Sequence, residues 1–76
     1  MEGYVVKALR TNLGLSQHDF AREVGVSQQM ISLIESGKMP ISERLEKRII
    51  YRFNVKDEEI AAIRKLKTFR DGGVNE

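Results

Sequence analysis

The stretch that decides the fold is residues 17–36, QHDFAREVGVSQQMISLIES. Its apolar residues recur at helical spacing on both sides of Gly25, which predicts two short helices joined by a tight turn. Ala21 supplies the small side chain needed where the helices come closest, and Gly25 permits the positive φ with which the turn begins. The apolar seam between the two helices consists of Phe20, Val24, Val26, Ile31 and Ile34.

The rest of the chain predicts three further helices around this pair. Residues 2–13 form the first, which Gly14 ends, and residues 57–70 form the last, with acidic residues in its first turn and basic residues in its last. The second, third and fourth helices begin after the N-cap residues Ser16, Ser27 and Ser42. We therefore predict an all-α fold: a compact five-helix domain over residues 1–70, with a helix-turn-helix at helices 2 and 3, and a flexible tail at 71–76.

The fourth and fifth helices supply the remaining core. The fourth ends at Asn54, which can take the left-handed conformation that glycine often fills after a helix. Its predicted buried residues are Leu45, Ile49, Ile50 and Phe53. From the fifth helix we expect Ile60 to close the core.

Length and composition narrow the classes of function. The chain has 76 residues, no cysteine and one histidine, so we expect neither a disulfide nor a metal site, and we expect no cofactor. No apolar stretch reaches the roughly 18 residues of a membrane span, and we see no signal peptide. We expect a cytoplasmic, nucleoid-associated protein of a bacterial or phage-infected cell, without membrane contact.

Positive charge is concentrated directly after the central stretch. Residues 17–36 carry Arg22 against three acids, a net charge of −2, whereas residues 37–56 carry six cations against Glu43 and Glu46, a net charge of +4. A local basic patch is what binding to a phosphate backbone requires. The alternative is that these cations lie on a solvated helix face.

Three pieces of the sequence, LGLSQ, FAREVGVSQQ and IESGK, carry a family resemblance. From Leu9 through Lys38 the chain resembles the phage repressor and Cro family of XRE-like helix-turn-helix proteins, especially lambdoid repressors whose recognition helix opens with Gln-Gln. Residues 39–56 match more loosely. The resemblance implies a sequence-specific transcription regulator, a repressor or Cro-like switch, that reads an operator in double-stranded DNA through the major groove.

In that arrangement the start of the third helix faces the base edges, and the expected base contacts are Ser27, Gln28, Gln29, Ser32 and Leu33. A glutamine amide matches the N7 acceptor and N6 donor of adenine. The resemblance implies that Gln28 reads an adenine and Gln29 the adjacent pair, whereas the alternative is that both are merely soluble helix formers. Leu33 either covers a thymine methyl or turns inward against the fourth helix.

Contacts to the DNA backbone are expected around the second helix and after the third. The resemblance implies that Gln17, at the start of the second helix, clamps a phosphate. Further candidates for phosphate contact are Arg10, Ser36, Lys38 and Arg44. The resemblance also pairs Arg10 with Glu35 in a partly buried, structural ion pair.

The last helix carries apolar residues beyond what a small core needs. Ile63, Leu66 and Phe69 follow one another at spacings of three, and we predict that they form a homodimer interface, because such operators have two half-sites one helical turn apart. The alternative is that they pack onto the first helix. A second class of function is an antitoxin that binds a protein partner through this helix. An enzyme is not expected, because no nucleophile–base pairing or phosphate-binding glycine loop occurs.

Overall fold

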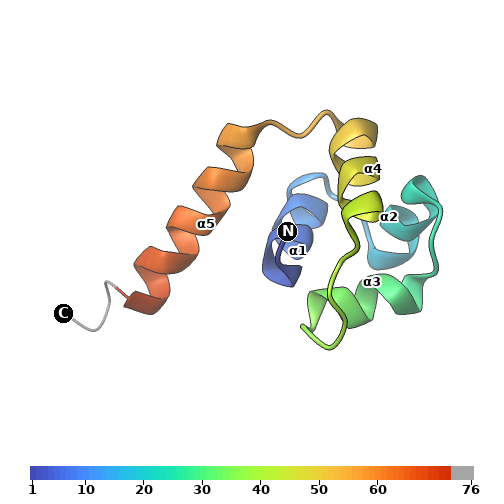
Figure 1. The fold of residues 1–76 in the computed structure, drawn as a ribbon, viewed down its shortest axis with the longest axis horizontal. Coiled ribbons are helices and arrows are strands. Elements are labelled where there is room, and N and C mark those ends of the chain that lie inside the picture. Colours follow the sequence, from blue (N-terminus) through green and yellow to red (C-terminus); the bar gives the residue numbers. More distant parts are fainter. Residues whose placement is uncertain (73–76) are drawn as a thin grey trace.

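The computed structural model describes the backbone of residues 1–72 and the side chains of residues 1–69. Within that part of the chain lie five helices and no strand, which confirms the all-α prediction. The helices are α1 (Gly3–Asn12), α2 (Gln17–Val24), α3 (Gln28–Glu35), α4 (Glu43–Phe53) and α5 (Asp57–Gly72). In Figure 1, α1 to α4 gather into one body, and α5 lies along its side, away from α2 and α3.

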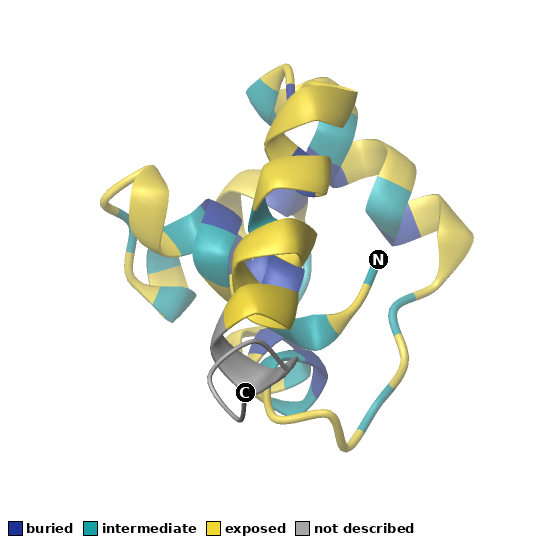
Figure 2. Cartoon of the chain, turned by 90° about the vertical axis from the view of Figure 1, so that its left-hand side faces the viewer, coloured by how far each residue is buried: buried dark blue, intermediate teal, exposed yellow. Residues whose placement is uncertain are grey.

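The core lies among α1 to α4 and is closed at one side by the start of α5. Its buried residues are Val5, Val6, Leu9, Phe20, Ala21, Val24, Ile31, Ile34, Leu45, Ile49, Val55 and Ile60. Ile50 and Phe53 were expected to be buried and are half-buried instead, although the Phe53 ring stacks on Phe20 with ring centroids 5.2 Å apart. Figure 2 shows that α5, the helix nearest the viewer, is exposed over most of its length.

Serine side chains fix the starts of three helices. The Oγ atoms of Ser16, Ser27 and Ser42 each accept a hydrogen bond from the backbone N–H three residues later, at 3.0, 3.1 and 3.1 Å. Each bond satisfies one of the N–H groups that has no partner within its own helix. The three predicted N-caps are therefore present.

The turn between α2 and α3 depends on Gly25, whose φ of 74° and ψ of 33° are left-handed. Val26 donates its backbone N–H to the carbonyl of Ala21 at 3.0 Å, and Gly25 donates to Arg22 at 3.3 Å. This pair of bonds closes the last turn of α2 and redirects the chain. As a result α3 begins within four residues of the end of α2 and packs against it.

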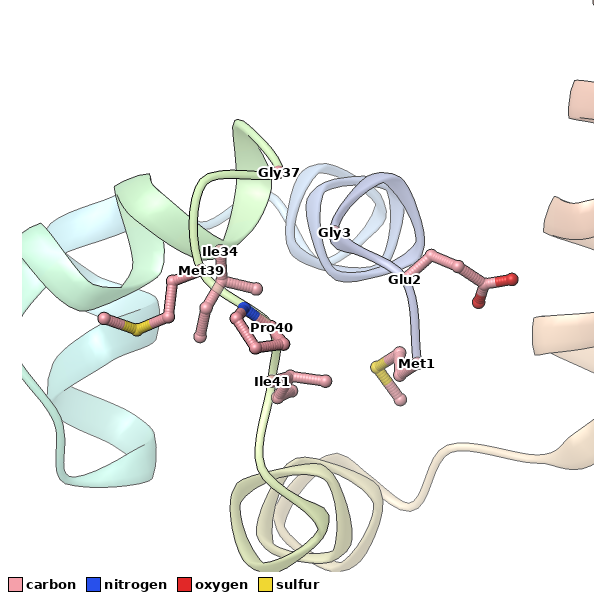
Figure 3. Close-up of a pocket in the computed structure, with 8 residues that line it drawn as sticks. All are labelled: Met1, Glu2, Gly3, Ile34, Gly37, Met39, Pro40 and Ile41. Carbon is pink, nitrogen blue, oxygen red and sulfur yellow. The ribbon is translucent and has the colours of Figure 1, made fainter.

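Gly3 marks a close approach that the sequence pattern does not reveal. A Cβ atom at Gly3 would lie 2.0 Å from the carbonyl oxygen of Ile34, so α1 begins directly against the last turn of α3. Figure 3 shows Gly3 in this position, beside a hollow that Met39 and Ile41 of the loop after α3 also line. The contact ties the first turn of α1 to the end of α3.

Two predicted boundaries differ from the structure. The first helix was predicted over residues 2–13, but α1 ends at Asn12, and Leu13 is exposed because the turn at Gly14 has already begun. The last helix was expected to end at Arg70, but α5 continues to Gly72, because a glycine lowers helix propensity without by itself ending a helix. Of the predicted tail at 71–76, residues 73–76 lie outside the described residues.

Candidate nucleic-acid interface

The first turn of α3 presents polar side chains to solvent. Ser27, Gln28 and Gln29 are exposed, and neither glutamine amide forms a hydrogen bond with another residue of the described chain. The N-cap hydrogen bond, which Ser27 accepts from the backbone N–H of Met30, fixes the direction in which this turn points. Both amides therefore keep their donors and acceptor for an external partner. Farther along α3, Ser32 is exposed and Leu33 is half-buried.

A partly buried ion pair holds α1 against the end of α3. Arg10 donates from Nε to Oε2 of Glu35 at 2.7 Å and from Nη2 to Oε1 at 3.1 Å, so the predicted ion pair is present and bidentate. Its side chains are 13% and 4% exposed. These hydrogen bonds to Glu35 raise the pKa of Arg10 above its already high ordinary value, so the guanidinium stays charged. Arg10 also donates from Nη1 to the carbonyl of Leu15 at 2.9 Å, which fixes the loop before α2.

Gln17 belongs to the same network. Its Nε2 donates to Oε1 of Glu35 at 3.0 Å, so the amide expected to clamp a phosphate is held by a carboxylate in this structure. The amide oxygen of Gln17 cannot bind a phosphate oxygen, because both are acceptors. A phosphate at this place would instead meet the first backbone N–H groups of α2, which have no partner within the helix.

A polar hollow lies where α1, α2 and α3 meet. Its lining consists of Lys7, Arg10, Gln17, Ser32, Glu35 and Ser36. Lys7 was not among the predicted site residues, yet it is exposed and lines this hollow together with Gln17, the first residue of α2. The available signal was its position three residues before Arg10, which places both on one face of α1.

The basic block at 37–56 divides into two groups. Lys38 and Arg44 are exposed and have no ion pair with any described residue, so their charges are available to a ligand. Arg48 instead donates to the carbonyl of Val24 at 2.9 Å, and Arg52 forms an ion pair with Glu23. These two arginines hold α4 against the end of α2, so part of the block serves the fold.

Four other predicted site residues differ in how accessible their side chains are. The hydroxyl of Ser36 donates to the carbonyl of Leu33 at 3.1 Å, so a phosphate contact by this side chain requires its rotation. On α5, Ile63 is half-buried and packs against the core, whereas Leu66 and Phe69 are 54% and 69% exposed. The predicted dimer interface is thus divided between an inward residue and two outward ones.

The described part of the chain has neither a cluster of metal ligands nor a helix suited to a membrane. Among its residues no group of three or more His, Cys, Asp or Glu side chains could hold a metal ion. None of the helices in this part of the chain has the length and apolar character to cross a membrane.

A short first helix, a capped α2, a glycine turn and an outward-facing α3 together define the helix-turn-helix class. A model of that family, described as helix-turn-helix, matches residues 6–60. The chain belongs to this family, in keeping with its resemblance to Cro and phage repressors. Membership of the family supports a role as a DNA-binding regulator.

One curated relative is similar to this chain over most of its length. The chain is 36% identical over 66 residues to "Antitoxin PezA" of Streptococcus pneumoniae serotype 4 (strain ATCC BAA-334 / TIGR4), an alignment that covers 87% of this chain and 42% of the relative. The chain therefore spans less than half the length of that relative. No solved structure matches the chain significantly.

Proposed function

We propose that this protein is a transcription regulator that reads a specific operator with α3 in the major groove. The observation that carries the proposal is the pair of exposed, unpaired amides of Gln28 and Gln29 at the start of α3. Each amide can make two hydrogen bonds to adenine, donating an N–H to N7 and accepting from N6 with its oxygen, or contact an adjacent base. Gln28 reads an adenine, and Gln29 reads the neighbouring base pair.

The remaining contacts surround this pair. Ser27 and Ser32 reach base edges on either side of the glutamines, and Leu33 covers a thymine methyl with the exposed part of its side chain. Phosphates are bound at the start of α2, where Lys7 and Gln17 lie, and after α3 by Lys38 and Arg44. Arg10 supports that surface mainly through its pairing with Glu35.

The regulator acts as a repressor in the cytoplasm. Two copies bind a near-palindromic operator whose half-sites lie one helical turn apart, and the bound dimer obstructs transcription. Phosphate contacts position both copies, while the glutamines supply the sequence preference.

Selection from random duplex DNA tests the base-reading assignment. The wild-type protein enriches a near-palindrome. Gln28→Ala costs about 1–3 kcal/mol of binding and relaxes one base position in each half-site, because the bidentate pair is lost. An unchanged motif with Gln28→Ala contradicts the contact assignment, and the absence of any enriched motif with the wild-type protein contradicts the proposed function.

Salt dependence tests the phosphate assignment. Lys38→Ala weakens binding to all sequences alike and reduces the salt slope by about 1 per site, because one counterion fewer is released. Lys47→Ala is the matched control, since Lys47 is also an exposed lysine and lies on α4 outside the proposed contacts. Equal slopes for the two variants contradict the role of Lys38.

A second candidate function is that of an antitoxin that also binds DNA. Similarity to a protein named as an antitoxin favours it, and the exposed Leu66 and Phe69 on α5 provide a surface for a protein partner. Co-purification of a toxin with the tagged protein, lost with Phe69→Ser, supports this candidate. Recovery of the tagged protein alone from its native host contradicts it.

A further inference from the structure

A hollow lies where the turn between α2 and α3 meets the beginning of α4. Its volume is about 330 Å³, and its lining consists of Val26, Met30, Ser42, Arg44, Leu45 and Arg48. We call it the arginine hollow, and it shares no residue with the polar hollow between α1, α2 and α3. Pockets that hold small molecules in proteins span about 300 to 1,000 Å³, so the arginine hollow has room for a small ligand.

The base of the arginine hollow is apolar. Leu45 is only 5% exposed and so lies deepest, while Val26 and Met30 are half-buried and pack against the core. A methionine side chain is flexible and polarisable, so it adapts to ligands of different shape. An apolar group placed on this base displaces water from three apolar side chains, which favours its binding.

The rim of the arginine hollow is positively charged. Arg44 and Arg48 are four positions apart and therefore lie on one face of α4. Arg44 is exposed and forms no ion pair with a described residue. Arg48 is held over the turn, because its Nη1 donates to the carbonyl of Val24 at 2.9 Å, and its other N–H groups form no hydrogen bond within the described chain. None of the described residues that line the hollow is acidic, so no nearby carboxylate competes with an incoming anion.

The combination of base and rim selects one class of ligand. A guanidinium binds a carboxylate through paired, charge-assisted hydrogen bonds and is weakly hydrated. Inorganic phosphate would use the arginines but leave the apolar base in water, and a neutral apolar molecule would leave the arginines unused. An organic carboxylate with a compact apolar body uses both parts.

We propose that the arginine hollow binds a small organic carboxylate, with its charged group at the two arginines and its apolar body on the base. Because Arg44 is also one of the proposed phosphate contacts, the ligand and the DNA backbone compete for its guanidinium. The ligand therefore weakens operator binding, and DNA weakens ligand binding by the same factor. This regulatory consequence rests on the proposed function, whereas ligand binding by the free protein does not.

NMR titration of the ¹⁵N-labelled protein tests the site. With 3-phenylpropionate and hexanoate as probes, we expect saturable shifts of the backbone amide signals of Val26, Met30 and Leu45. The dissociation constant should be on the order of 1 mM, as for other ligands of this size. 3-Phenylpropionamide, which has the same body without the charge, and acetate, which has the charge without the body, bind at least about tenfold more weakly. Absence of saturable shifts with both probes overturns the proposal, as does equal affinity for the amide or for inorganic phosphate.

Substitutions on α4 test the role of the rim. Arg44→Gln weakens binding of 3-phenylpropionate by about tenfold, because one of the two guanidinium partners is lost. Lys47→Gln is the matched control, since it removes the same charge from an exposed position of α4 that does not line the hollow, and it leaves the affinity unchanged. Equal losses in the two variants overturn the proposal, because net charge alone would then account for binding.

Competition with DNA separates this proposal from the proposed function. Saturating 3-phenylpropionate weakens binding of the wild-type protein to its selected duplex by about fivefold, whereas the amide in sodium chloride of the same ionic strength leaves it unchanged. Arg44→Gln binds the duplex more weakly and no longer responds to the carboxylate. Ligand binding without an effect on DNA binding overturns the regulatory consequence. A protein that binds the carboxylate and selects no DNA overturns the proposed function alone, and a protein that selects DNA and binds no carboxylate overturns the arginine hollow alone.

Discussion

The α2–α3 pair is held in the protein mainly by buried apolar side chains, whereas most of α5 is exposed. Every apolar seam residue of α2 and α3 except Val26 is buried, and the pair is bounded by α1 on one side and α4 on the other. Among its described side chains, α5 buries Ile60 and half-buries Ile63, and its ion pair with Glu2, the N-cap residue of α1, is about half exposed. The first region is suited to present side chains at fixed positions, and the second is suited to gain a partner.

The ion pairs show the same difference. Glu35 is almost fully buried and receives hydrogen bonds from both Arg10 and Gln17, whereas Glu2 and Arg64 meet where both are about half exposed. A buried carboxylate cannot lose its partner without a large penalty, while an exposed pair exchanges protein contacts for water. The comparison predicts that substitutions near α3 change the stability of the whole domain and that those near α5 act locally.

The largest effect is expected at the buried pair. Arg10→Ala leaves the Glu35 carboxylate buried with only Gln17 beside it, and we expect a loss of about 3–5 kcal/mol in the free energy of unfolding, measured by urea denaturation. Arg22→Ala, which removes the exposed partner of Asp19, serves as the control and costs about 0–1 kcal/mol. Similar losses for the two variants would show that burial of the Arg10 pair does not increase its contribution to the free energy of unfolding.

A smaller loss of stability is expected at Gly3, where the effect of a Gly→Ala substitution is opposite in sign to the usual one in a helix. Replacing a glycine by alanine within a helix ordinarily stabilises it by about 1 kcal/mol, but here the new Cβ meets the backbone of Ile34. Gly3→Ala should therefore destabilise the domain by about 1–3 kcal/mol, since backbone atoms must move apart. Thr11→Ala, at an exposed position of the same helix, controls for helix propensity. A stabilised Gly3→Ala variant would mean that the start of α1 moves freely relative to α3.

Gly3 also illustrates what the sequence could and could not reveal. The caps at Ser16 and Ser27 and the turn at Gly25 were predictable, because each depends on a few neighbouring residues with fixed backbone requirements. The approach of Gly3 to Ile34 depends on how two helices meet 31 positions apart in the chain, and no local pattern records it.

The candidate site likewise contains some features that the sequence predicted and others that it did not. Exposure of Gln28 and Gln29 followed from helical spacing, and the pairing of Arg10 with Glu35 followed from family resemblance. The hydrogen bond from Gln17 to Glu35 was missed, because a polar side chain at a helix start has several partners within reach. Arg48 belongs to the basic block at 37–56, but its hydrogen bond to the carbonyl of Val24 became visible only with the tertiary arrangement.

The smallest effect is expected at the exposed pair of α5 and concerns pH. Hydrogen bonds from Arg64 lower the pKa of Glu2 below its ordinary value, so the ionised carboxylate favours the docked helix. A carboxyl group whose pKa is lowered by folding adds stability above its unfolded pKa, and that stability is lost as the pH falls through its folded pKa. Comparing the thermal midpoints of wild-type protein and Glu2→Gln between about pH 6 and about pH 3 isolates this contribution, because the other carboxyl groups titrate in both. The difference should be largest at the upper end and vanish at the lower end, and it should be smaller than the effect of Gly3→Ala, since solvent screens the pair. A difference that persists at the acidic end would mean that Glu2 supports α5 by packing rather than by charge.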